Sequence, residues 1–245
     1  MAAKCIYGLS ILLCLLLGCS SKMNEMNIAK KTVYRKNLEM KDATAYRESV
    51  TAYDRNGHVV KEQLFDPAGS VIRTVEYTYN GEQCAKEVHS DAGGTQLLTK
   101  DYTYTGGKLE RVVVKGKQSS ELDYSYDDAG GQDEFMKIDG QQKHQKHRDS
   151  NGKILWEVNL MDGDRTEYAY DENGNLTQIR EEHKEGHTTI RYRNEYDAEG
   201  NLAKVYMNQI LASAFVYENG RVVKEIVYAP DGSPEVEMTF EYELY

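Results

Sequence analysis

The chain has 245 residues and a formal net charge of -10, which argues against a surface for nucleic acid or for an anionic membrane. Charged residues make up 29% of the chain and the mean hydropathy is -0.70, so the sequence predicts a thin hydrophobic core. Tyrosine dominates the aromatic residues, with 19 Tyr against 4 Phe and 1 Trp. Because tyrosine tolerates one wet edge, we expect aromatic rows on a half-covered sheet.

The first residues carry an export signal. Lys4 supplies a positive end, and residues 6–17 form an apolar run that is shorter than the roughly 20 residues of a membrane-spanning helix. The run ends in the sequence LLGC at residues 16–19, followed by two serines. This ending resembles the lipobox of bacterial lipoproteins, which implies cleavage before Cys19 and lipid attachment to Cys19. An ordinary cleaved signal peptide is the alternative interpretation.

This assignment accounts for all four cysteines of the chain. Residues 1–18 are expected to be a lipoprotein signal peptide that removes Cys5 and Cys14, and residues 19–31 a lipidated cysteine with a polar tether. Cys84 then remains alone, so the fold must hold without an internal disulfide. No histidine with Asn or Asp frames Cys84 as a nucleophile, and a half-buried strand position is favoured for it.

Residues 32–245 are expected to form a single β-repeat domain. A first strand pair is predicted over residues 32–38 and 43–53. Turn signals then recur at intervals that leave room for strands of about eight residues, the spacing of an all-β chain. One gap, between residues 200 and 218, has only a weaker turn signal at residues 207–209. The stronger signals lie at residues 54–57, 66–69, 80–81, 91–94, 106–107, 115–117, 127–130, 139–140, 149–152, 162–164, 171–174, 185–186, 197–200, 218–220 and 230–232.

The predicted strands carry closely spaced aromatic residues as they approach a turn. Lys, Glu, Arg, Thr and Gln dominate the intervening positions, so one face is apolar and the other wet, which is typical of an antiparallel sheet. We predict an all-β, antiparallel β-meander of repeated hairpins that forms a curved open sheet. The aromatic pairs are Tyr77 and Tyr79, Tyr102 and Tyr104, Tyr124 and Tyr126, Tyr168 and Tyr170, Tyr192 and Tyr196, Phe215 and Tyr217, and Phe240 and Tyr242.

Four of the turns share the motif Tyr-Asp-x-x-Gly and resemble the YD repeats of RHS-type proteins. The resemblance implies long arrays of hairpins that spiral into a β-shell around a toxin or form a large extracellular scaffold. This array is far shorter, its middle at residues 133–147 departs from the motif, and no toxin domain is expected after it, which is why we expect an open sheet. The motif residues are Tyr53, Asp54 and Gly57; Tyr126, Asp127 and Gly130; Tyr170, Asp171 and Gly174; and Tyr196, Asp197 and Gly200.

The motif residues are interpreted as structural. Asp and Gly are favoured at the first and fourth positions of a type I turn, and the tyrosines are cross-strand packing groups. A cation-binding loop at Asp171, Asn173 and Gly174 is the functional alternative. It lacks the further oxygen ligands and the distant Glu of a calcium hand, so no metal is expected there.

No recognisable catalytic constellation emerges from the remaining residues. The histidine pairs His144 with His147 and His183 with His187 lack a nearby cysteine or an intervening zincin-type Glu. The 40 carboxylates are spread over turns and the wet face, and none are marked out as a glycosidase pair. We therefore predict a non-enzymatic protein without a cofactor.

The leading hypothesis is a lipid-anchored lipoprotein of a Gram-negative envelope, in the outer membrane, that serves as a binding or scaffold module for a protein partner. A sheet edge or the concave face would make the contact, and the acidic character favours a basic partner. A glycan-binding accessory that uses exposed tyrosine rows is the alternative. A hydrolase would need two carboxylates of raised pKa in a pocket. The sequence does not fix the oligomeric state.

Overall fold

The computed structural model describes residues 27–245. The expected signal peptide over residues 1–18, the expected lipidation site Cys19 and the tether up to residue 26 lie outside the described residues. The first strand begins at Ile28, before the expected domain start at residue 32. No helix among residues 27–245 is long and apolar enough to cross a membrane.

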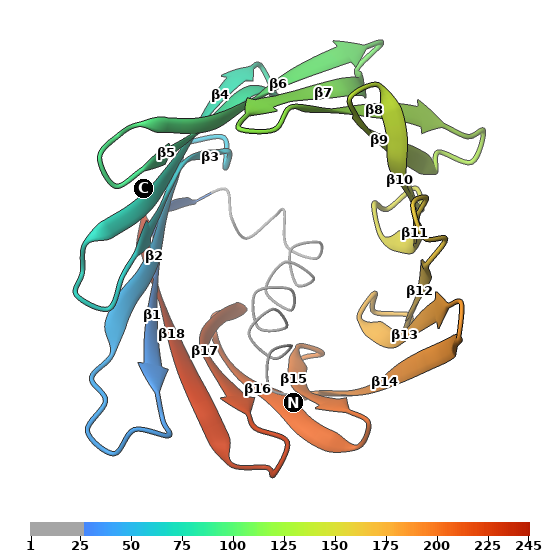
Figure 1. Ribbon diagram of the computed structural model, residues 1–245. Coiled ribbons are helices and arrows are strands. Elements are labelled where there is room, and N and C mark those ends of the chain that lie inside the picture. The colour runs from blue at the N-terminus through green and yellow to red at the C-terminus, as the bar shows by residue number, and fades with distance from the viewer. Residues whose placement is uncertain (1–26) are drawn as a thin grey trace.

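The described chain forms one antiparallel sheet of 18 strands in which each strand pairs with the next along the sequence. The ribbon forms a closed ring with β1 beside β18 (Figure 1). The strands are β1 (Ile28–Asn37), β2 (Tyr46–Tyr53), β3 (Val59–Phe65), β4 (Val71–Asn80), β5 (Gln83–Asp91), β6 (Gln96–Thr105), β7 (Lys108–Gly116), β8 (Ser120–Tyr126), β9 (Gln132–Ile138), β10 (Gln141–Arg148), β11 (Ile154–Asn159), β12 (Arg165–Tyr170), β13 (Leu176–His183), β14 (Gly186–Tyr196), β15 (Leu202–Met207), β16 (Ile210–Glu218), β17 (Arg221–Tyr228) and β18 (Pro234–Leu244).

Closure of this ring corrects the prediction of an open sheet. The all-β antiparallel meander was predicted correctly, but the open edges were wrong, because β1 pairs with β18 from Ile28 opposite Leu244 to Asn37 opposite Val236. Each edge of an open sheet leaves a row of backbone N–H and C=O groups unpaired, and closing the barrel pairs both rows with each other. The middle at residues 133–147, which departs from the YD motif, takes part as β9 and β10.

The barrel has two different ends. β1 begins and β18 finishes at one end, which we call the terminal end. The eight turns on that end lie at residues 54–58, 81–82, 106–107, 127–131, 149–153, 171–175, 197–201 and 219–220. The opposite, distal end holds the connections at residues 38–45, 66–70, 92–95, 117–119, 139–140, 160–164, 184–185, 208–209 and 229–233. All four Tyr-Asp-x-x-Gly motifs therefore turn the chain at the terminal end.

Asp54 shows how a motif aspartate builds its turn. Its backbone N–H donates to the carbonyl of His58 at 2.8 Å, and the N–H of Gly57 donates back to the Asp54 carbonyl at 3.1 Å. The Asp54 side chain accepts the N–H groups of Asn56 and His58 at 2.8 and 2.9 Å. Gly57 has φ of 84°, a left-handed conformation that costs glycine little.

The same backbone bonds recur at the other three motif aspartates. Asp127, Asp171 and Asp197 each receive the N–H of the motif glycine. Next to the motif turns at Tyr53, Tyr170 and Tyr196, a register shift lets two residues oppose one across the pair, which is the β-bulge that accompanies such a three-to-five-residue loop.

The two faces of the sheet differ in crowding and charge. Paired positions put the tyrosines on the same face as the buried residues Val75, Val112, Val205 and Met238. In a closed barrel, side chains on the concave side converge and those on the convex side splay apart, so this crowded face is the interior. The aromatic rows thus line the inside of the barrel.

The outer face carries ion pairs between neighbouring strands. Lys61 pairs with Glu76 at 3.1 Å, and Lys224 pairs with Glu237 at 3.0 Å. Because pairs of this kind sit on many strands, the outer surface is polar around the ring. The further cross-strand pairs are Lys30 with Glu243, Lys115 with Asp101, Arg111 with Asp123, Lys137 with Asp123, and Lys204 with Glu195.

The seam between β1 and β18 can be tested with a disulfide. Tyr34 and Thr239 lie directly opposite each other, and opposed strand positions have Cα atoms about 4.5 to 5.5 Å apart, within the range of a disulfide. In a Cys84→Ser background, the double variant Tyr34→Cys with Thr239→Cys is expected to oxidise to a species of altered mobility on a non-reducing gel.

Tyr34→Cys with Thr78→Cys is the control, because Thr78 lies on β4, three strands from β1 in the ring. Equal oxidation of both pairs, or of neither, would contradict a closed seam.

Candidate functional site

Tyrosine and glutamate side chains pair along the interior wall. The Tyr77 hydroxyl donates to Glu62 at 2.7 Å, and the Tyr102 hydroxyl donates to Glu87. Burial, together with the adjacent carboxylate, raises the pKa of Tyr77 and of Tyr102. The phenols are therefore held as neutral donors. Two further pairs, on β8–β9 and β11–β12, are Tyr124 with Glu134 at 3.0 Å and Tyr168 with Glu157 at 2.5 Å.

A second row of tyrosines links neighbouring hairpins at the terminal end. The hydroxyl of each reaches the backbone carbonyl near the start of the preceding strand, so each hairpin is fastened to the one before it. The bonds run from Tyr79 to Val59 at 2.9 Å, from Tyr126 to Leu109 at 3.0 Å, from Tyr170 to Ile154 at 2.8 Å and from Tyr242 to Val222 at 2.8 Å.

Tyr196 varies this scheme, because its hydroxyl donates to the Asp171 carboxylate at 2.6 Å. The motif residues expected from the sequence therefore lie together along one rim. Their contacts are turn bonds and links between hairpins.

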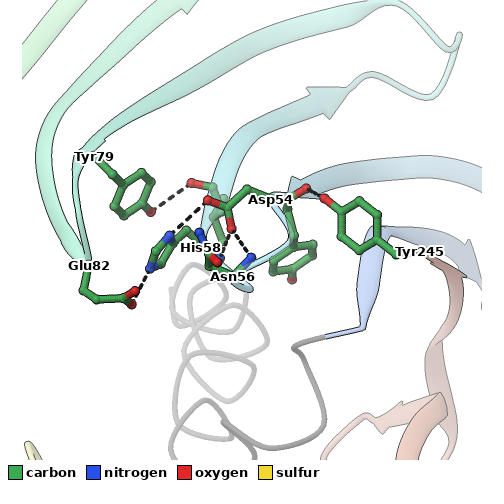
Figure 2. A network of polar contacts seen from close by, with 8 residues as sticks. Asp54, Asn56, His58, Tyr79, Glu82 and Tyr245 are labelled. Carbon is green, nitrogen blue, oxygen red and sulfur yellow. Dashed lines mark hydrogen bonds and ion pairs between the residues drawn. The ribbon is translucent and has the colours of Figure 1, made fainter.

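Figure 2 shows the rim network at the turn between β2 and β3. His58 lies between two carboxylates, with Nδ1 3.0 Å from Asp54 and Nε2 2.9 Å from Glu82. Its ring stacks on Tyr79 with centroids 4.6 Å apart. On the other side of the turn, the Tyr245 hydroxyl donates to the backbone carbonyl of Tyr53. The last residue of the chain is thus tied to the second strand.

An interior recess on this wall gathers polar groups. Its volume is about 370 Å³, and it spans the inner face of β2 to β6 around the middle of these strands. It is lined by Ser49, Thr51, Glu62, Leu64, Arg73, Val75, Tyr77, Glu87, His89 and Lys100.

A chain of polar contacts crosses the recess. Arg73 Nη2 lies 2.6 Å from His89 Nδ1, and His89 Nε2 lies 3.0 Å from a Glu87 carboxylate oxygen. Because a guanidinium has no acceptor, it must donate to Nδ1, which assigns the His89 proton to Nε2. Lys100 Nζ adds an ion pair to Glu87 at 2.8 Å.

The carboxylate of Glu87 is held in its ionised form. Burial by itself would raise the pKa of Glu87. Hydrogen bonds from Lys100, then from Tyr102 and His89, outweigh burial and lower the pKa. This is opposite to the raised pKa that a general acid requires, so Glu87 does not provide the carboxylate pair that a hydrolase would need.

The distal end gathers exposed apolar side chains. Among residues 27–245, seven of the eleven exposed large hydrophobic residues lie in or beside its connections. Met161 and Met40, in the connections after β11 and β1, are 69% and 63% exposed. The other five are Leu64, Ile72, Leu97, Leu160 and Ile210.

The histidine pairs noted in the sequence do not converge. His144 contacts Glu157 at 3.4 Å on the interior wall, whereas His147 stacks on Trp156. His183 bonds to Asp164 at 2.9 Å, while His187 is opposite Glu182 in the β13–β14 pair. Among residues 27–245, no group of three or more His, Cys, Asp or Glu could hold a metal ion.

Sequence reasoning missed the interior recess and its residues. One signal was present, since the fourth or fifth residue of several strands that leave the terminal end is glutamate. Glu62 in β3 and Glu157 in β11 are fourth residues, and Glu87 in β5 and Glu225 in β17 are fifth residues. A repeated acidic residue on an otherwise apolar face predicts inward polar pairing.

No protein-family model matches the chain, and no curated protein matches it. Among solved structures, the chain is similar to a porin-like protein from Bacteroides uniformis, with 13% identity over 89% of this chain and 98% of that chain and a TM-score of 0.35. A porin-like protein from Bacteroides vulgatus shows 12% identity over 88% and 98%, with a TM-score of 0.40.

The Tc holotoxin pore of Photorhabdus luminescens shows 15% identity, with coverage of 89% of this chain but only 14% of that chain, and a TM-score of 0.32. These identities and TM-scores are too low for the likenesses to bear on function.

The rim histidine gives a prediction about pH. The hydrogen bond to Glu82 is the largest cause that raises the pKa of His58; burial opposes it, and Asp54 adds to it. Because the folded pKa is raised, the stabilisation by charged His58 is present below its ordinary pKa of about 6.5 and is lost as pH rises through the folded pKa.

Glu82→Gln is expected to lower the pKa of His58 in an NMR titration of its ring protons. Because the Glu82 side chain is 84% exposed, added salt should shrink the difference. Glu110→Gln, in the next hairpin, is the control. An unchanged His58 pKa in Glu82→Gln would refute the bridge.

Proposed function

We propose that this chain is a lipid-anchored, non-enzymatic binding module of a Gram-negative cell envelope, in the outer membrane, built from a short array of YD-type hairpins. The distal end docks a protein partner. The observation that carries this proposal is the separation of the two ends. The described chain starts and finishes at the terminal end, whereas the exposed apolar side chains gather at the distal end.

Exposed apolar side chains that gather on one surface are typical of interaction sites. Because Ile28 begins β1 at the terminal end, a lipid on Cys19, nine residues earlier in the sequence, would hold this end toward the membrane. The distal end then points away from the membrane and is accessible to a partner. The net charge of -10 favours a partner with basic groups around an apolar contact.

The outer face supports attachment by lipid over insertion of the barrel. Lysine and arginine residues of the cross-strand ion pairs, such as Lys61 and Lys224, would face hydrocarbon if the barrel spanned a bilayer. Each such residue costs about 2 to 4 kcal/mol at the bilayer midplane. A barrel that stands in water and is held by acyl chains on Cys19 avoids this cost.

The glycan-binding alternative relied on exposed tyrosine rows, and the structure turns those rows inward. The hydroxyls of Tyr77 and Tyr79 are already engaged with Glu62 and the Val59 carbonyl. A sheet edge is likewise not offered to a partner, because β1 and β18 pair with each other. Docking by strand addition is therefore replaced by contact through the distal connections.

Removal of the lipidated cysteine tests the anchor. Cys19→Ala is expected to move the protein from the membrane fraction to the soluble fraction of fractionated cells, because lipid could no longer be attached there. Cys84→Ser is the control, since Cys84 lies half-buried in β5. Persistent membrane association of Cys19→Ala would reject the lipid anchor.

Site-specific photo-crosslinking tests the docking end. A photoreactive amino acid is placed at Met161, and for comparison at Leu155, an exposed residue at the opposite end of the same strand region. The full-length protein in intact envelopes is expected to yield a crosslinked species from position 161 that is absent from position 155.

Met161→Asp is expected to weaken recovery of the same partner at least about tenfold, since it places a charge in an apolar contact. Crosslinks of equal yield from both positions, or from position 155 alone, would contradict the assignment of the distal end.

A further inference from the structure

The interior recess is lined by two cationic and two anionic side chains, and only one cation and one anion pair with each other. Glu87 receives the Lys100 ammonium at 2.8 Å, the Tyr102 hydroxyl and the His89 ring. Lys100 and Glu87 therefore neutralise each other inside the wall. The other two charged groups are Arg73 on β4 and Glu62 on β3.

Arg73 lacks a carboxylate partner among residues 27–245. Its one hydrogen bond within this part of the chain runs from Nη2 to the His89 ring, which is a neutral acceptor in the assigned tautomer. The Nε atom is buried and has no hydrogen-bond partner. A guanidinium carries five donors in a planar fork that matches a carboxylate, so Arg73 retains both charge and unused donors.

Glu62 faces the same recess from the neighbouring strand. Leu64 is opposite Arg73 and Glu62 is opposite Val75, which makes Glu62 and Arg73 diagonal neighbours, about 7 to 8 Å apart at the backbone. One carboxylate oxygen of Glu62 accepts the Tyr77 hydroxyl at 2.7 Å. A carboxylate has about four acceptor sites, so Glu62 can accept further donors from a ligand.

We propose that the interior recess binds a small polar ligand that carries a carboxylate and, a few ångströms away, a hydrogen-bond donor. The ligand carboxylate pairs with Arg73, and its hydroxyl or ammonium group donates to Glu62. Leu64 and Val75 supply an apolar patch beside these groups, and Ser49 and Thr51 supply hydroxyls.

The volume and the charge of the recess agree with this class. A volume of about 370 Å³ falls at the small end of ligand pockets, which run from about 300 to 1,000 Å³. The positive charges of Arg73 and Lys100 balance the negative charges of Glu62 and Glu87. A zwitterionic ligand therefore leaves the recess neutral, and a sugar acid adds one negative charge beside Arg73. A sugar acid and an amino acid share this chemistry. The recess shares only Leu64 with the exposed apolar residues of the distal end. The docking test uses Met161, so failure of the recess would leave the docking proposal intact.

Calorimetric titration of the full-length protein in detergent tests the site with three probes. Galacturonate carries a carboxylate with hydroxyls, alanine carries a carboxylate with an ammonium group, and galactose is the neutral control. We expect galacturonate or alanine to bind more tightly than galactose by at least about tenfold, the effect of one charge-assisted contact. Binding of galacturonate alone would identify a hydroxyl as the group that donates to Glu62, and binding of alanine alone would identify an ammonium group.

Arg73→Gln is expected to weaken the preferred carboxylate at least about tenfold. Arg111→Gln removes the same charge from the outer face, where Arg111 pairs with Asp123, and should leave binding unchanged. Arg73→Lys keeps the charge without the planar fork, and an intermediate loss is expected if Arg73→Gln does not fold.

Three results would overturn the proposal. They are the absence of binding by both carboxylates up to about 10 mM, equal binding of galactose, and equal effects of Arg73→Gln and Arg111→Gln.

Discussion

The pairing of the first strand with the last is the interaction on which the rest of this structure depends. β1 is hydrogen-bonded to β18 on one side and to β2 on the other, so residues more than two hundred positions apart in sequence share a ladder. Without it the sheet would have two unpaired edges and no inside. With it, one face becomes a crowded wall on which charged groups meet, and the other becomes a polar exterior.

The barrel is stabilised by a thin hydrophobic core together with hydrogen bonds from tyrosines on its inner face. Apolar residues such as Ile179, Val205 and Phe215 are buried against neighbours from adjacent strands, while tyrosine hydroxyls satisfy inward glutamates and backbone carbonyls. Each tyrosine thereby contributes both apolar area and a hydrogen bond. This use of tyrosine agrees with the high tyrosine content and the low hydropathy of the chain.

The two ends of the barrel differ in structure. The terminal end is consolidated by motif turns, by the tyrosine links between hairpins and by the contact of Tyr245 with Tyr53. The distal end carries the longest connection, residues 38–45, and most of the exposed apolar side chains. The interior recess lies around the middle of the wall, between the two ends. This arrangement is the basis of the proposal that the protein is anchored at one end and binds a partner at the other.

The sequence by itself determined the local features, because alternation along a strand and the turn chemistry of Asp and Gly act over a few residues. Even the weak signal at Asn208 and Gln209 became a turn, with φ of 48° and 75°. Only the tertiary structure decided that the sheet closes and that the motif turns share one end. It also brought together the lining of the recess, since five strands contribute its side chains and their meeting depends on the register between strands and on the direction of curvature. Neither property can be read from a repeat in one strand.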